Sequence, residues 1–279
     1  MNERVEAEDI ALLLLRLVAG GGIIALAIMP LPGTPLVKGH TWPAVLLALD
    51  AALVVAGVWT RPAALLGGIG SMAVMIAGVA AGQRFNFEPA RDLMFACVFA
   101  TVAIAGAGRL TVARPSAVRA SPGQRDAAML VLRVLAGLSL FVIDGLIKAR
   151  LGIHAAATHS SWGFELGIAR WGFPLPLLVT TLAVLNETLL PLLIAAGVFA
   201  RPLSLAIVAH MLIGYTISAH YGSEDAVTAL LYAASYAAIA LCGPGRFAFA
   251  SAVARRGSSA VSGNTFPAPD VTALPTRPT

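Results

Sequence analysis

The chain has 279 residues, of which 58% are hydrophobic and 12% are charged, and its formal net charge is +5 at pH 7. Water-soluble domains carry about a quarter charged residues and cannot remove this much apolar surface from water. The composition therefore excludes an ordinary soluble protein. The basic residues lie in short segments between apolar runs, which excludes a nucleic-acid-binding groove and indicates a chain solvated by lipid.

Apolar runs follow one another along the chain, and most are close to the ~20 residues that cross ~30 Å of hydrocarbon. The runs fall at 9–29, 43–59, 62–82, 90–107, 126–148, 175–200, 202–219 and 225–242. Pro and Gly residues end several of them, because Pro cannot donate a backbone hydrogen bond and Gly adopts positive φ. The predicted fold is all-α, a polytopic transmembrane bundle of about eight helices.

Lys and Arg residues are denser on one side of the predicted membrane, chiefly in the segment 108–125. The positive-inside rule then predicts that both termini face the cytoplasm, in a multi-pass protein of the bacterial plasma (inner) membrane. Residues 1–8 are mostly acidic and lack the positive start of a secretory signal, so the first helix is expected to stay in the membrane. The tail is rich in Ser, Gly, Pro and Thr and is expected to be disordered at least from 257.

Three short segments recur in the same order in both halves of the chain. Residues 14–20 resemble 131–137, residues 57–62 resemble 197–202, and residues 106–109 resemble 243–246. Matches in a shared order predict a duplicated four-helix unit, and an even helix number per unit makes the two copies parallel. The predicted parts are an N-terminal segment 1–8, a first repeat 9–107, a basic linker 108–125, a second repeat 126–246 and a tail 247–279.

Ionisable side chains inside the apolar runs are the strongest indication of a site, because each costs about 2.5–3.5 kcal/mol to insert. The candidates for catalysis are Glu187, Arg133 and His210. Arg133 is expected to reach Glu187 and form an ion pair, which either locks the bundle or makes Glu187 a proton carrier. His210 stands alone on an apolar helix and is either a hydrogen-bonded core histidine or a proton relay.

Asp144 and Lys148 are four residues apart, a spacing that lets them pair on one helix face. This pair is interpreted either as a pair at the membrane interface or as the outer gate of a pocket that the segment 149–174 closes. The predicted cofactor-binding residues are Asp144, Lys148, Glu187, Tyr215 and Tyr236. The spacing of His and Glu residues matches no metal-site template, so no metal is predicted. Cys97 and Cys242 lie far apart and predict no dithiol centre.

The second half of the chain carries a sparse set of ordered motifs. They are Arg133 in a Leu-Arg-x-x-x-Gly context, Gly145-x-x-Lys148, Glu187 in the next helix, Gly197-x-x-x-Arg201-Pro202 and the closing segment 243–246. In these motifs the chain resembles the DoxX/DoxD family of four-helix membrane proteins, well over 126–250 and weakly over 9–112. Asp144 stands where that family often has His, and the first half lacks the Gly-x-x-Lys element, so a site in the first repeat is in doubt.

The resemblance implies a redox-associated membrane subunit, similar to the membrane subunit of a thiosulfate:quinone oxidoreductase. No haem ligand pair, flavin motif or cysteine pair is evident in the sequence, so no intrinsic cofactor is predicted. The resemblance implies a quinone as the ligand and, besides the lipid bilayer that the composition predicts, a soluble or membrane redox partner. Two alternatives stay open: a small-solute or proton-coupled permease, and a structural or assembly protein without catalysis. The residues leave open whether the chain is itself an enzyme or a subunit of a quinone-linked oxidoreductase.

Overall fold

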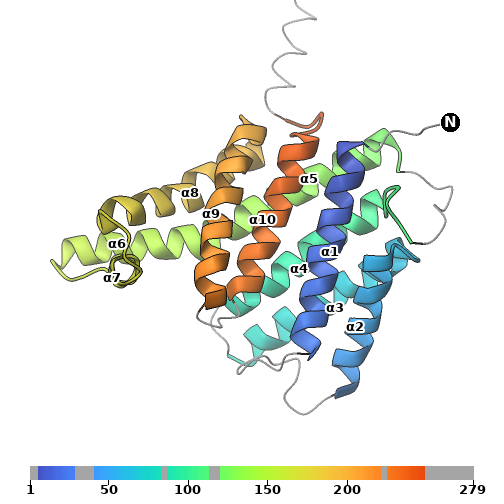
Figure 1. Ribbon diagram of the computed structural model, residues 1–279, viewed down its shortest axis with the longest axis horizontal. Coiled ribbons are helices and arrows are strands. Elements are labelled where there is room, and N and C mark those ends of the chain that lie inside the picture. Colours follow the sequence, from blue (N-terminus) through green and yellow to red (C-terminus); the bar gives the residue numbers. More distant parts are fainter. Residues whose placement is uncertain (1–5, 29–40, 83–86, 113–119, 221–224, 249–279) are drawn as a thin grey trace, which may run out of the picture.

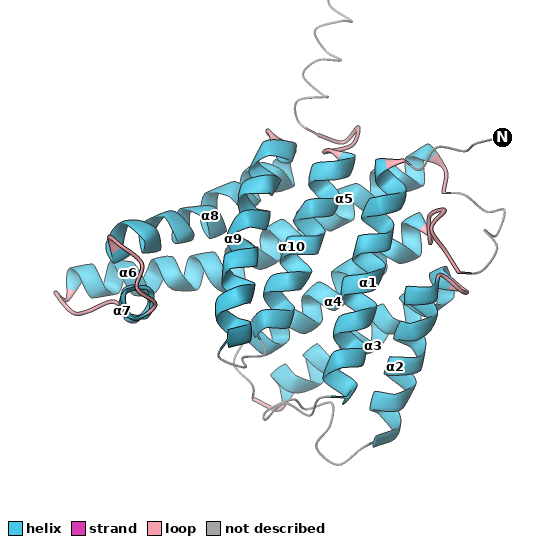
Figure 2. Cartoon of the chain, viewed as in Figure 1, coloured by secondary structure: helices cyan, strands magenta, loops and turns pink. Residues whose placement is uncertain are grey.

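The computed structural model describes residues 6–28, 41–82, 87–112, 120–220 and 225–248. Over these ranges the chain is all-helical and contains no strand (Figure 2). The predicted tail disorder from 257 and part of the predicted linker, 113–119, lie outside the described residues.

The helices follow the apolar runs closely. Their bounds are α1 Ala7–Ile28, α2 Thr41–Ala56, α3 Thr60–Ala80, α4 Phe87–Ala105, α5 Pro122–Ser139, η1 Leu140–Gly145, α6 Leu146–Ala157, α7 Gly163–Arg170, α8 Pro176–Ala196, α9 Ala200–His220 and α10 Asp225–Cys242. Among the described residues, six helical stretches are long and apolar enough to cross a membrane. These stretches belong to α1, α3, α5 with η1 and α6, α8, α9 and α10, and they identify a helical membrane protein.

Two of the eight expected spans, α2 and α4, are not among the helices that are long and apolar enough to cross a membrane. The apolar part of α2 is only the short stretch Val45–Ala56. Helix α4 has three charged residues in its first turns, Glu88, Arg91 and Asp92, which lower its apolar character. Both helices nevertheless pack within the bundle: α2 contacts α1 and α3, and α4 contacts α3, α5 and α10 (Figure 1).

Helices α5, η1 and α6 form one continuous helical stretch of 36 residues. At 1.5 Å per residue the stretch is ~54 Å long, well above the ~30 Å of a hydrocarbon core. It begins at a capping box in which Ser121 and Gln124 bond each other's backbone N–H groups. Its far end, with α7 and the start of α8, extends beyond α9 and α10 (Figure 1). We call this part of the molecule, formed by the end of α6, α7 and the start of α8, the α7 end.

Two arginines are buried at the end of the bundle that lies away from the α7 end, where several helices end. Arg16 on α1 and Arg133 on α5 are 1% and 2% exposed, and both donate to backbone carbonyls. Arg16 bonds the carbonyl oxygens of Val54 (2.9 Å), Val55 (2.8 Å), Ala107 and Leu110 (3.0 Å). Arg133 bonds those of Pro244 (2.5 Å) and Phe247 (2.8 Å). Carbonyls at helix ends lack helical N–H partners, so each arginine satisfies groups that burial would otherwise leave unpaired.

Two aspartates bind the turns that follow α4 and α10. Asp9 Oδ1 accepts the backbone N–H of Arg109 at 2.9 Å, and Asp126 Oδ1 accepts that of Arg246 at 3.1 Å. In each turn the glycine just before the arginine has a positive φ, +71° at Gly108 and +68° at Gly245. A residue with Cβ would be strained in that conformation, so both turns require glycine.

Candidate functional site

A cavity of about 390 Å³ lies at the α7 end of the bundle. Side chains from η1, α6, α8, α9 and α10 form its walls, and α7 with the residues that follow it covers one side. Most of the lining is apolar or aromatic, with Phe164, Trp171 and Phe173 contributed by the segment 149–174. The volume is within the ~300–1,000 Å³ typical of small-molecule sites.

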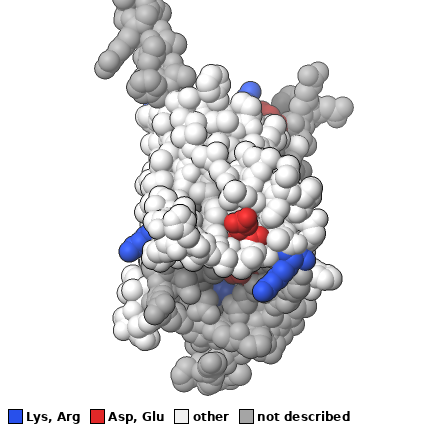
Figure 3. Space-filling model, turned by 90° about the vertical axis from the view of Figure 1, so that its left-hand side faces the viewer, with Lys and Arg blue, Asp and Glu red and all other residues white. Residues whose placement is uncertain are grey.

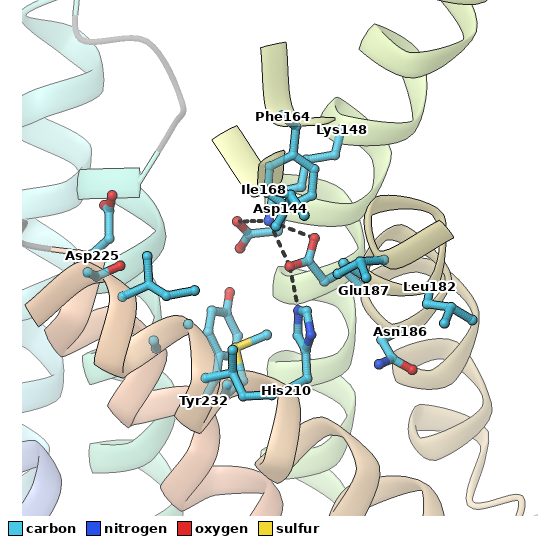
Figure 4. Close-up of a pocket in the computed structure, with 18 of the residues that line it drawn as sticks. Asp144, Lys148, Phe164, Ile168, Leu182, Asn186, Glu187, His210, Asp225 and Tyr232 are labelled. Atoms are coloured by element: carbon cyan, nitrogen blue, oxygen red, sulfur yellow. Dashed lines mark hydrogen bonds and ion pairs between the residues drawn. The ribbon is translucent and has the colours of Figure 1, made fainter. Parts of the chain in front are cut away.

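A cluster of four ionisable side chains forms part of the cavity wall (Figure 4). Lys148 Nζ donates to both carboxylate oxygens of Glu187, each at 2.7 Å, and lies 3.6 Å from Asp144 Oδ1. His210 Nε2 is 3.0 Å from Glu187 Oε1. The Glu187 side chain is only 4% exposed, so its charge depends on these two partners.

Glu187 and His210 each lie near the middle of their helix. Glu187 lies 11 residues, or ~16 Å, after the start of α8, and His210 lies 10 residues, or ~15 Å, before the end of α9. Both helices are 21-residue stretches that are long and apolar enough to cross a membrane, so each residue lies near the middle of its candidate span. Ionisable groups at that depth need partners inside the protein, and the cluster supplies them.

Gly145 lets the first helix of this cluster approach α8 closely. A Cβ at Gly145 would lie 2.7 Å from the carbonyl carbon of Glu187 and 2.8 Å from Thr188 Cγ2. The glycine ends η1, a stretch of π-helix that includes Asp144. Such stretches change the direction in which side chains leave a helix and often occur at functional sites. The glycine and the π-helix together set the distance from Lys148 to Glu187.

Replacing Gly145 by Ala is expected to lower the free energy of unfolding by about 1–3 kcal/mol, because the new methyl group meets backbone that cannot turn away. Gly21→Ala on α1 is the matched control, since a Cβ there has no atom within 4 Å. That change is expected to be neutral or to stabilise by about 0.5–1 kcal/mol. Unfolding in mixed micelles, followed by circular dichroism, measures both; equal stability of the two variants would contradict the close approach.

Tyr232 on α10 also lines the cavity and was not among the predicted site residues. Its hydroxyl shares a 2.7 Å hydrogen bond with Ser139 Oγ. Phe164 lies over the Lys148 ammonium, with Nζ 5.0 Å from the ring centroid, which favours the charged lysine. Tyr232 lies within the apolar run 225–242 and Phe164 in the segment 149–174, and nothing in the sequence indicates which side chain either residue will contact.

Three of the predicted site residues, Arg133, Tyr215 and Tyr236, lie outside the cavity lining. The expected ion pair between Arg133 and Glu187 is wrong, because Arg133 lies at the opposite end of the bundle, bound to carbonyls after α10. His210, which the sequence predicts to be either a hydrogen-bonded core histidine or a proton relay, lines the cavity and is hydrogen-bonded to Glu187. Tyr236 is fully buried in the core, its hydroxyl lacks a hydrogen-bond partner among the described residues, and it does not line the cavity. Tyr215 does not line the cavity either.

Within the described ranges, no three His, Cys, Asp or Glu side chains are grouped so that they could hold a metal ion. Comparison with family models, curated proteins and solved structures found no match. The chemistry of the cavity is set by a lysine, a histidine and three carboxylates, those of Asp144, Glu187 and Asp225, against apolar and aromatic walls. Such a site can bind a largely apolar molecule and hold one polar end of it by hydrogen bonds.

Proposed function

We propose that this chain is a DoxX/DoxD-like, redox-associated membrane subunit that binds a quinone head group in the cavity. The observation that carries the proposal is the cluster of Lys148, Glu187 and His210, buried in the wall of an apolar cavity inside membrane-spanning helices. A quinone is a flat apolar ring with two carbonyl acceptors. Lysine and histidine N–H groups can donate to such carbonyls, and aromatic walls can pack against the ring.

The proposal explains why charges are retained at mid-membrane depth at a cost in insertion. A bundle that needed only packing would be more stable with apolar side chains of similar volume, because buried ion pairs seldom repay their desolvation. A carboxylate bonded to both lysine and histidine can also accept or supply the proton that accompanies quinone reduction or quinol oxidation. The electron donor or acceptor would be a partner protein, in the soluble phase or in the membrane.

Ligand-dependent thermal stability of the purified protein in detergent tests the proposal. Decylubiquinone and menadione are the probes, and saturation at 100 times the Kd is expected to stabilise the wild type by about 2.7 kcal/mol. His210→Ala and Glu187→Gln are expected to weaken the response at least tenfold in Kd, or about 1.4 kcal/mol, because the first removes a hydrogen-bond donor to the quinone and the second removes the carboxylate that holds Lys148 and His210 in place. Tyr215→Phe, on the same helix as His210 but outside the cavity lining, should respond as the wild type does.

Absence of any response in the wild type would exclude quinone binding. In that case, Glu187-dependent uptake of a solute into proteoliposomes would favour a proton-coupled permease instead. One observation argues against a permease. Helix α8 is continuous through Pro191, so it has no unwound segment of the kind that forms transport sites.

We further propose that the chain crosses the bacterial plasma membrane eight times as two parallel four-helix repeats, with both termini in the cytoplasm. In this arrangement α1, α2, α3 and α4 correspond to α5 with its extension, α8, α9 and α10. The neighbours support it: α1 packs on α10 as α5 packs on α4, and α3 pairs with α4 as α9 pairs with α10. The arginine–carbonyl contacts of Arg16 and Arg133 and the turns bound by Asp9 and Asp126 correspond in the same way.

The same correspondence assigns the cavity chemistry to the second repeat. Glu187 corresponds to Leu47 and His210 to Gly70. The hydrogen-bonded pair of Ser139 and Tyr232 corresponds to Gly22 and Phe95, which also pack together: a Cβ at Gly22 would lie 3.1 Å from the Phe95 ring. The first repeat thus keeps the packing and lacks the polar groups, which fits a scaffold role for that half.

A further inference from the structure

The cavity meets the outer surface of the protein between α8 and α9. Leu182 on α8 and Ile213 on α9 both line the cavity, yet they are 52% and 50% exposed. Buried residues such as Glu187 and Met211 line its inner part. The lining therefore runs continuously from the ionic cluster to the surface.

This opening lies within the parts of α8 and α9 that are long and apolar enough to cross a membrane. Leu182 is six residues, or ~9 Å, after the start of α8, and Ile213 is seven residues, or ~10 Å, before the end of α9. The surface beside the opening is apolar, with half-exposed Leu178, Leu185 and Leu212. Uncharged surface also dominates the view onto the α7 end (Figure 3). Acyl chains, rather than water, would face an opening at this depth and of this composition.

We propose that the cavity is entered sideways from the bilayer through this opening, and that its ligand is a lipid-dissolved molecule whose hydrocarbon tail lies between α8 and α9. The inference rests on the proposed function for the identity of the head group and adds the route and the tail. The polar head is held by Lys148 and His210 beside Glu187, and the tail leaves past Leu182 and Ile213 into the acyl chains.

Gly214 is the residue that keeps this route open. It lines the cavity one helical turn after His210 and beside Ile213, and a Cβ built on it has no atom within 4 Å. A Cβ at this position would therefore enter open space, and the rest of a larger side chain would leave it on the cavity side of α9. Gly214→Leu should fold as the wild type does and should occupy the path of the tail.

Binding of a tailed and a tailless quinone to the protein in lipid nanodiscs tests the inference. Gly214→Leu is expected to weaken decylubiquinone binding by at least about tenfold, the equivalent of 1.4 kcal/mol, and to change menadione binding by less than about threefold. Leu182→Trp, which enlarges a half-exposed side chain on the other side of the opening, should show the same selectivity. Gly21→Leu on α1, where a Cβ likewise has no atom within 4 Å, is the control and should change neither affinity.

The outcomes separate this inference from the proposed function. If the wild type binds both probes and the Gly214 and Leu182 variants lose both equally or lose neither, the lateral route is wrong while quinone binding stands. If the wild type binds neither probe, the proposed function fails and the tail route fails with it. Loss of the tailed probe alone, in both variants, supports the route.

Discussion

Replacement of Lys148 by Met is expected to lower the free energy of unfolding by about 3–5 kcal/mol. Lys148 is bonded to both oxygens of Glu187 and lies 3.6 Å from Asp144, and the side chains of these carboxylates are 4% and 9% exposed. Without the ammonium, two carboxylates remain buried close together with only His210 to compensate them. Methionine has a similar length and no charge, so the loss reports the charge rather than the volume.

Unfolding in mixed micelles of dodecyl maltoside and SDS, followed by circular dichroism, measures the Lys148 effect. Arg150→Met is the control, because Arg150 is an exposed cation two residues further along the same helix. Its loss should stay within about 0.5 kcal/mol. The double variant Lys148→Met/Glu187→Gln should recover part of the stability, since it removes the charge that was left unpaired. A Lys148→Met protein as stable as the Arg150 control would show that the carboxylates do not depend on the lysine.

Arg16→Met and Arg133→Met are each expected to lower the free energy of unfolding by about 3 kcal/mol, since hydrogen bonds to a charged group contribute about 1.5–3 kcal/mol each. Each substitution removes donors from carbonyl groups at the ends of helices and in the turns that follow them: those of Val54, Val55, Ala107 and Leu110 for Arg16, and of Pro244 and Phe247 for Arg133. The same unfolding measurement applies, with the exposed Arg170→Met as the control.

The pair of arginine variants also tests the duplication. Corresponding residues in two copies of one unit should lose similar stability, and neither variant should change quinone affinity, because neither arginine lines the cavity. A large loss for one arginine with none for the other would argue against the correspondence of α1 with α5. Loss of quinone binding in Arg133→Met, with stability retained, would place Arg133 in the site after all.

The helices were predictable because lipid makes local hydropathy decisive. A segment that crosses hydrocarbon must satisfy its backbone internally, so a run of about 20 apolar residues becomes a helix whatever its neighbours are. The run 175–200 contains α8, and the run 202–219 lies within α9. The pairing of Asp144 with Lys148 was equally local, since residues four apart share a helix face. For α4 the hydropathy was misleading. The charged residues in its first turns are hidden when hydropathy is averaged over a whole run, so the run 90–107 was predicted to be a span.

The partner of Glu187 was not predictable in the same way. Arg133 was chosen because it is long and lies in the preceding apolar run, but it lies near the opposite end of α5, where free carbonyls take its donors. The true partners depend on how α8 is rotated, on the π-helix before Lys148 and on the closeness that Gly145 permits. None of these quantities is a property of one helix.

The sequence by itself therefore determined that lipid surrounds most of this protein, where its long apolar helices lie, and which side chains need partners inside it. These properties follow from the transfer free energies of single segments. Only the tertiary structure decided which charges meet, that Tyr232 and Phe164 join them, and that the cavity opens between α8 and α9. Those outcomes depend on the rotation and depth of helices relative to each other. Packing of small residues such as Gly145 fixes that geometry, and hydropathy does not encode it.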